Sequence, residues 1–105
     1  MARLVIKYPN TEGANFDFDY YTATHIPLSQ KLLAEFGMGH FEILRGEESV
    51  AGDDPAFLCI TQINFPGAEQ IKAGLAAHGD ELKADFGNYT NIKPVVTICE
   101  PVTRG

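Results

Sequence analysis

Alternating hydrophobic and polar residues near the start of the chain predict a β-strand over residues 3–8 (RLVIKY). The three residues that share its apolar face are Leu4, Ile6 and Tyr8. Residues 9–13 (PNTEG) are rich in turn formers and end this strand. The second half of the chain contains three further strand patterns, at residues 41–45, 56–65 and 94–100.

Apolar residues at intervals of three and four predict a helix after this first strand. The residues that form the stripe are Phe18, Tyr21, His25, Leu28, Leu32 and Phe36. Asp17 can cap the first turn, and Gly37 supplies a C-terminal stop. Pro27 lacks an amide donor, and its ring disfavours helical geometry at Ile26. We therefore expect the helix to break or kink over residues 24–27.

A second helical pattern follows Pro66 and Gly67 and carries Ile71 and Leu75 on its apolar side. We expect it to break at residues 78–79 (His-Gly). A short second helix would then run from Asp80, which can cap it, to Phe86, and Gly87 would stop it.

The order of these elements is β-α-β-β-α-β, which predicts an α+β, ferredoxin-like fold with a four-stranded antiparallel sheet. Both helices of such a fold cover one face of the sheet, so the other face of a monomer should be polar. The last two strands are instead apolar on both faces: Phe57, Cys59 and Ile63 oppose Leu58 and Ile60, and Val95 opposes Val96 and Ile98. We therefore expect a single domain, residues 1–105, that forms a homodimer through its sheet faces.

Composition excludes several classes of partner. The 105 residues carry a net charge of −6 with only eight Lys and Arg, which argues against nucleic acid and against an anionic membrane as partners. The RNA recognition motif shares the topology, but its third strand needs a basic residue, and residues 56–65 contain none. No apolar run is long enough to cross a bilayer and no signal peptide is evident, so we expect a cytoplasmic protein.

The two cysteines, Cys59 and Cys99, lie within apolar strands and favour buried thiols over a disulfide framework. No CxxC or clustered Cys/His spacing predicts a metal site. No nucleophile elbow, phosphate-binding glycine loop or dinucleotide fingerprint occurs, so no cofactor is predicted.

Two segments together resemble a known family. Residues 16–28 (FDFDYYTATHIPL) are similar to the FD-x-x-Y-Y-x-x-x-H-x-P-L signature of EthD-like proteins, and residues 86–94 (FGNYTNIKP) are similar to that family's NYT-x-x-x-P segment. The resemblance extends over nearly the whole chain, including Tyr8-Pro9 and the position of Gly46. It implies a dimeric α–β barrel, in which the sheets of two ferredoxin-like subunits close a barrel. Similar folds serve isomerases, cyclases, decarboxylases and cofactor-free monooxygenases, so the reaction stays open.

His25 is the leading candidate for chemistry. Its position on the apolar stripe points it inward, where an imidazole can titrate near neutrality and move a proton; relatives have a histidine at the matching position. The alternative is a structural histidine that binds free carbonyls at the kink. Tyr21, four residues earlier, can stack beside the imidazole and take part in catalysis, or simply fill the core.

Further residues are candidates for binding a small molecule. Tyr20 lies on the flank of the stripe, and by resemblance Tyr89 and Asn88 border a cavity between helices and sheet; otherwise they form a polar turn. Phe18, Phe57 and Phe86 would supply apolar walls or ordinary core. Two functions follow: a cofactor-independent enzyme in which His25 exchanges a proton with an apolar, carbonyl-bearing or aromatic metabolite, or a non-catalytic protein that holds such a ligand or assists an oxygenase.

Overall fold

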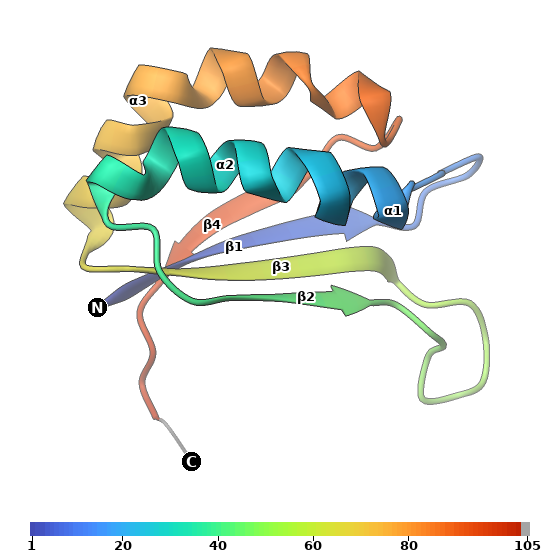
Figure 1. The fold of residues 1–105 in the computed structure, drawn as a ribbon. Helices are drawn as coiled ribbons and strands as arrows, with labels where there is room; N and C mark the ends of the chain where they lie inside the picture. Colours follow the sequence, from blue (N-terminus) through green and yellow to red (C-terminus); the bar gives the residue numbers. More distant parts are fainter. Residues whose placement is uncertain (104–105) are drawn as a thin grey trace.

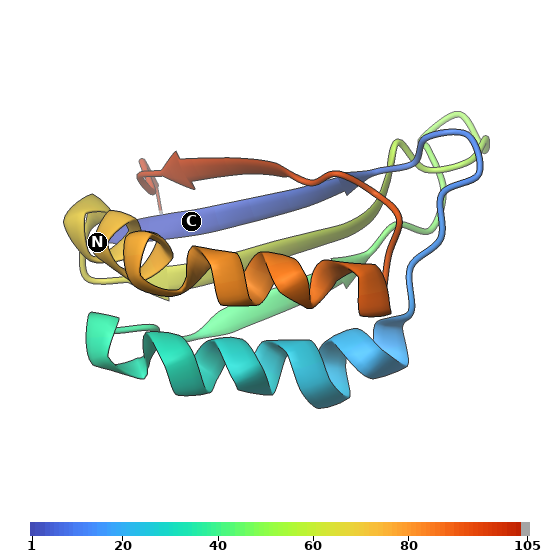
Figure 2. The ribbon, with the colours of Figure 1, turned by 90° about the horizontal axis from the view of Figure 1, so that it is seen from above.

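The computed structural model describes residues 1–103; residues 104–105 of the predicted domain lie outside that range. Within residues 1–103, four strands form one antiparallel sheet, namely β1 (Ala2–Pro9), β2 (Phe41–Arg45), β3 (Phe57–Phe65) and β4 (Val95–Cys99). Their order across the sheet is β2-β3-β1-β4, and two helical segments lie side by side on one face (Figure 1, Figure 2). The predicted ferredoxin-like βαββαβ fold is confirmed.

The first helical segment is continuous but changes its winding. It consists of α1 (Phe18–Tyr20), a π-helical turn η1 (Tyr21–His25), α2 (Ile26–Leu33) and a 3₁₀ turn η2 (Ala34–Phe36). The side chain of Asp17 accepts a hydrogen bond from the Tyr20 amide at 3.1 Å, so the predicted cap is present. Gly37, with φ of +85°, ends the segment in the left-handed conformation that glycine favours.

Of the two alternatives predicted for residues 24–27, a break or a kink, the break is wrong. Ile26 keeps helical angles, φ −64° and ψ −45°, and its amide donates to the carbonyl of Tyr21, five residues back. Pro27 is the second residue of α2 and has no amide donor, so the continuous helix loses one backbone hydrogen bond there. The π-turn lies directly before α2, and functional residues often lie at such bulges.

The predicted break at His78-Gly79 is also wrong. One helix, α3 (Ala68–Ala84), runs through both residues, and Asp80 lies inside it rather than at a cap. A glycine inside a helix costs roughly 1 kcal/mol relative to alanine. Burial of Ile71 and Leu82 on the side that faces the sheet offsets this cost. The 3₁₀ turn η3 (Phe86–Asn88), which contains Gly87, then leads towards β4.

The hydrophobic core lies between the sheet and the helices and divides into two clusters. The first gathers mainly aliphatic residues of β1, β3 and the helices around the pair Leu4 and Ile63, which face each other across β1 and β3. The second gathers Tyr8, Tyr21, Ile26, Cys59, Tyr89 and Ile92. Cys59 is buried as predicted, whereas Cys99 on the edge strand β4 is exposed in this chain.

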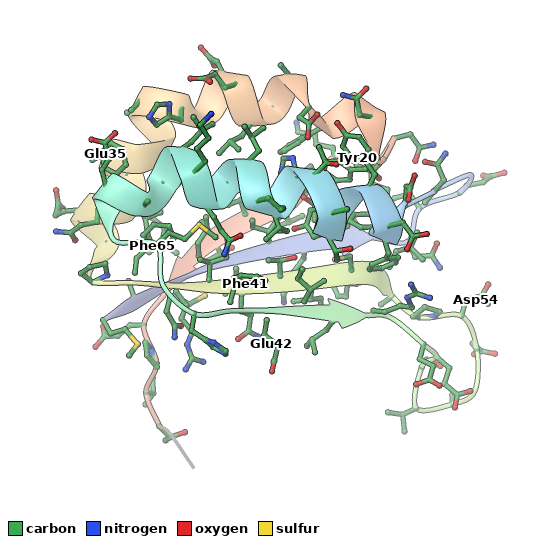
Figure 3. The ribbon with its side chains drawn as sticks, viewed as in Figure 1. Tyr20, Glu35, Phe41, Glu42, Asp54 and Phe65 are labelled. Carbon is green, nitrogen blue, oxygen red and sulfur yellow. The ribbon has the colours of Figure 1, made fainter. Side chains whose placement is uncertain are left out.

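No helix within residues 1–103 covers the other face of the sheet (Figure 1). In Figure 3, Phe41 points from β2 towards the helices, and Glu42 points away from them. The residues on the open face are mixed rather than uniformly apolar; they include Val5, Leu44, Phe57, Ile60 and Val95 beside Arg3, Lys7, Glu42, Gln62 and Asn64. Leu44 is 43% exposed and Val95 is 55% exposed.

A β-bulge changes the predicted arrangement at the start of β3. Tyr8 pairs with Cys59 and Pro9 pairs with Phe57, so Leu58 has no partner in β1. Phe57 therefore lies on the open face, where the Lys7 ammonium is 5.3 Å from the centre of its ring. The prediction that Phe57 shares a face with Cys59 is wrong.

In the described part of the chain, no helix is both long enough and apolar enough to cross a membrane.

Candidate functional site

A cavity of about 650 Å³ lies between the helical layer and the β1–β4 side of the sheet. This volume is within the range of pockets that hold small molecules. Its walls are mainly apolar and are formed by Leu4, Ile6, Leu33, Ile63, Leu75, Leu82, Phe86, Ile92, Pro94 and Val96. Three buried polar side chains also reach it, those of Tyr8, His25 and Ser29. The exposed residues Asp80, Lys83 and Lys93 lie along its outer side.

His25 is held by a carboxylate from the other helical segment. Its side chain is 7% exposed, and its Nδ1 atom is 2.9 Å from Oδ2 of Asp85. Oδ1 of Asp85 accepts hydrogen bonds from the Tyr20 hydroxyl at 2.7 Å and from the Asn88 amide at 2.9 Å. Figure 3 places Tyr20 on the helical segment that faces the end of α3. Asp85 thus fixes the orientation of the imidazole ring.

The electrostatics of this pair indicate one tautomer. Burial lowers the pKa of His25 below 6.5, and the neighbouring Asp85 only partly opposes this effect, so the imidazole is neutral near pH 7. Burial alone would raise the pKa of Asp85, but hydrogen bonds from Tyr20, Asn88 and His25 outweigh it and lower that pKa. Since an ionised carboxylate only accepts, the proton of neutral His25 lies on Nδ1. Nε2 is then a free acceptor.

Two tyrosines connect Nε2 to the cavity wall. The Tyr89 hydroxyl is 3.4 Å from Nε2 of His25, and the Tyr8 hydroxyl is 2.9 Å from that of Tyr89. Because Nε2 has no proton, Tyr89 donates to it, and Tyr8 donates to Tyr89. Burial raises the pKa of both phenols well above 10, so both hold their protons near pH 7. We call the series Asp85, His25, Tyr89 and Tyr8 the proton chain.

Tyr21 packs against this chain without joining it. Its ring is stacked on the imidazole of His25, with ring centres 5.5 Å apart, as its position four residues earlier predicted. Its hydroxyl, however, is 2.7 Å from Oγ1 of Thr61 on β3 and does not line the cavity. Burial raises the pKa of this phenol as well. Tyr21 therefore orients the imidazole by packing.

The structure brings most of the predicted site residues together around Asp85. Tyr20 and Asn88 bind its carboxylate, Tyr89 contacts His25, and the Phe86 ring lies 5.7 Å from the imidazole and lines the cavity. Two of the predicted aromatic walls lie elsewhere. Phe18 packs on Phe16 and on the guanidinium of Arg45, and Phe57 lies on the open face of the sheet.

Sequence reasoning missed Asp85, Tyr8 and Thr61 as members of the site. A signal existed for Asp85, because a carboxylate at the C-terminal end of a helix meets the negative end of the helix dipole and needs a compensating partner. Tyr8 was recognised only as an inward-facing strand residue. No pattern marked Thr61, whose partner is fixed by tertiary packing.

Metal ligands do not gather in the described residues, since no group of three or more His, Cys, Asp or Glu side chains forms there.

Comparisons with known proteins connect this geometry to a family. A crystal structure of an EthD-like protein from Ralstonia eutropha JMP134 is 33% identical over 99% of this chain and 94% of that one, with a TM-score of 0.90. An EthD family protein from Bacillus halodurans C-125 shares 22% identity over 97% of this chain and 99% of its own, with a TM-score of 0.68. An antibiotic biosynthesis monooxygenase superposes at a TM-score of 0.50 with 12% identity, over 98% of this chain and 100% of that one, which shows a shared fold alone. No protein-family model and no curated protein matches the chain.

Proposed function

The chain belongs to the EthD-like family, and from that premise we propose that its cavity binds a small apolar or aromatic metabolite bearing a carbonyl or phenol group and that His25 exchanges a proton with this ligand. The observation that carries the proposal is the proton chain, which runs from the half-buried carboxylate of Asp85 through His25 and Tyr89 to Tyr8, a residue that lines the cavity. An apolar pocket with a few converging polar groups and a histidine of shifted pKa is typical of an active site.

The hydrogen-bond directions define a proton path. Tyr8 lines the cavity, and in this path its oxygen accepts the acidic proton of the ligand, from a carbon beside a carbonyl or from a phenol. The proton of Tyr8 passes to the oxygen of Tyr89, and the proton of Tyr89 passes to Nε2 of His25. The imidazolium that forms is stabilised by the carboxylate of Asp85, and the new O–H of Tyr8 donates to the ligand anion.

Return of the proton to another atom of the ligand would complete an isomerisation. Loss of a group from the anion before the proton returns would complete a cleavage. General acid–base catalysis of this kind typically contributes about 10²–10⁴-fold in rate.

The experiment is proton exchange in D₂O with a panel of apolar 1,3-dicarbonyl compounds, followed by NMR. The wild-type protein should accelerate exchange of the acidic C–H, and His25→Gln should reduce the acceleration by about 10²-fold or more. Tyr8→Phe and Tyr89→Phe should each impair it, since each interrupts the path. His40→Gln is the matched control, because it makes the same change at an exposed histidine that does not line the cavity, and it should retain exchange. Equal exchange in wild type and His25→Gln would contradict the proposal.

A second function has one specific observation in its favour. Every buried polar side-chain atom of the described residues has a hydrogen-bond partner, so the proton chain is satisfied without any ligand. That is the behaviour of a structural network around a non-catalytic binding pocket. Binding of the dicarbonyl probes without any accelerated exchange would identify the protein as such a binder.

We also propose that two copies associate through the open faces of their sheets. The exposed apolar side chains of Leu44 and Val95 on this face support the proposal, as does the membership of the fold among dimeric α–β barrels. Association of the same surface on two copies gives a closed twofold dimer.

A further inference from the structure

Two lysines line the exposed side of the cavity. Lys83 lies in the last turn of α3, and Lys93 lies between η3 and β4. Both side chains are exposed, and the ion pairs found within residues 1–103 involve neither of them. Among the described residues that line the cavity, the only carboxylate is Asp80. The cavity lining therefore has a net positive charge, in a chain whose net charge is −6.

Both lysines lie at the polar end of the cavity, Lys93 by strand register and Lys83 by its position near the end of α3. Val96 pairs with Ile6 and β4 runs antiparallel to β1, so Lys93 lies level with the Tyr8 end of β1. Lys83 precedes Phe86, whose ring contacts His25. The opposite end of the cavity is aliphatic and includes Leu4, Leu33 and Leu75. The cavity thus has a charged and polar end and an apolar end.

The backbone that carries Lys93 is firmly held. Ile92 is buried in the second core cluster, and its amide donates to the Thr90 hydroxyl at 3.1 Å. Pro94 follows directly and restricts Lys93 to extended backbone angles. Lys83 is fixed in turn by the helix and by its buried neighbour Leu82. The backbone that carries each lysine is therefore held beside the cavity.

We propose that the ligand is an amphipathic anion, with a carboxylate or sulfonate bound by Lys83 and Lys93 and an apolar body extending towards Leu4, Leu33 and Leu75. The inference rests on the proposed function for the cavity itself and for the position of the reacting group, which would lie beside Tyr8. The inference specifies in addition that the ligand carries a negative charge. An anionic group at this end lies next to the carbon or oxygen that loses its proton, so the class is that of carboxylates with a carbonyl or phenol close to the carboxyl group.

The test compares two fluorescent probes that share a body and differ in charge, 1-anilinonaphthalene-8-sulfonate and neutral N-phenyl-1-naphthylamine. The wild-type protein should bind the sulfonate about 5–20-fold more tightly at low salt, since two exposed ion pairs together give a factor of this size. The advantage should shrink at high salt. Lys83→Gln and Lys93→Gln should each weaken sulfonate binding about 2–5-fold and leave the neutral probe unchanged. Lys72→Gln, an exposed lysine of α3 that does not line the cavity, is the matched control.

A blocking variant shows where the probes bind. Gly79 lines the cavity, and a Cβ atom there would meet nothing within 4 Å, so Gly79→Phe can introduce a bulky side chain beside the cavity. It should abolish binding of both probes; undiminished binding would overturn the inference. Equal affinity of the wild type for the two probes, or lysine variants that behave as wild type, would overturn it too. Equal affinity for the two probes would not affect proton exchange with neutral dicarbonyls. The proposed anionic ligand and the proposed proton transfer by His25 can therefore fail separately.

Discussion

Nδ1 of His25 lies 2.9 Å from Oδ2 of Asp85, although the two residues are 60 positions apart in the chain. The π-turn places the imidazole on the first helical segment, and the C-terminal end of α3 supplies the carboxylate. Because this bond occupies Nδ1, the other ring nitrogen is directed to Tyr89 and, through it, to Tyr8. One contact between the two helical segments therefore organises the site.

The stability of the fold should depend on pH through His25. Burial lowers its pKa in the folded state below the unfolded value of about 6.5. The unfolded chain therefore binds a proton first as the pH falls, and the free energy of unfolding should decrease from about pH 6.5 down to the folded pKa. Urea unfolding at a series of pH values would measure this. His25→Gln should lack the decrease, and the exposed variant His40→Gln should retain it; identical profiles for wild type and His25→Gln would contradict the account.

Asp85 adds a second pH dependence at lower pH. The pKa of Asp85 in the folded state lies below 3.8. Its contribution to the free energy of unfolding is therefore fully present above about pH 3.8 and is lost as the pH falls through the folded pKa.

Replacement of Gly79 by alanine should stabilise the protein. The residue lies inside α3 and a Cβ atom meets no neighbour within 4 Å, so alanine gains about 0.5–1 kcal/mol from helix propensity alone. The melting temperature should rise by a few degrees, about 2–6 °C. Gly37→Ala is the contrasting control and should lower the melting temperature, because the φ of +85° at Gly37 and the nearby Pro66 ring both disfavour a side chain. A loss of stability in Gly79→Ala would show that α3 is not continuous there.

The buried bond between Tyr21 and Thr61 should contribute to stability. Their hydroxyl oxygens are 2.7 Å apart, and both residues are at most 1% exposed. Tyr21→Phe and Thr61→Val should each cost about 1–2 kcal/mol, since each leaves a buried hydroxyl without this partner. In a double-mutant cycle by chemical unfolding, the pair should cost less than the sum of the single changes by about 1 kcal/mol. Strict additivity would mean that the bond is absent in solution.

The proposed dimer should respond to charge on the open face. The mass measured by light scattering should be twice the 11.5 kDa of one chain at micromolar concentration. Val95→Glu should shift it towards one chain, because a carboxylate buried in an apolar contact is costly. Val50→Glu, in the exposed loop before β3, should leave the mass unchanged. A wild-type mass of one chain would contradict the dimer.

Local patterns in the sequence account well for the fold. Alternation predicted β1, and the spacing of the stripe from Phe18 to Phe36 predicted the first helical segment. The errors arose where a local signal competes with packing. Gly79 suggested a break, but burial of Ile71 and Leu82 keeps α3 intact. Pro27 suggested a break, but the chain continues from the π-turn into α2 without one.

The site was less accessible to sequence reasoning. His25 was identified because it is a titratable residue on the apolar stripe and because it matches the histidine of the EthD-like signature, and both are local properties. Its partner Asp85 and the link from Tyr89 to Tyr8 join residues 60 or more positions apart, and no local pattern specifies such pairings. Phe57 was assigned to the wrong face because the bulge at Leu58 reverses the alternation of β3 at that point.

The tautomer and titration of His25 test the proton chain most directly. In ¹⁵N NMR spectra of the ring, the wild-type protein should show a neutral imidazole near pH 7, protonated on Nδ1 and unprotonated on Nε2, with a pKa below 6.5. Asp85→Asn should lower that pKa further, since it removes the adjacent negative charge. A proton on Nε2, or a pKa at 6.5 that Asp85→Asn leaves unchanged, would contradict the account.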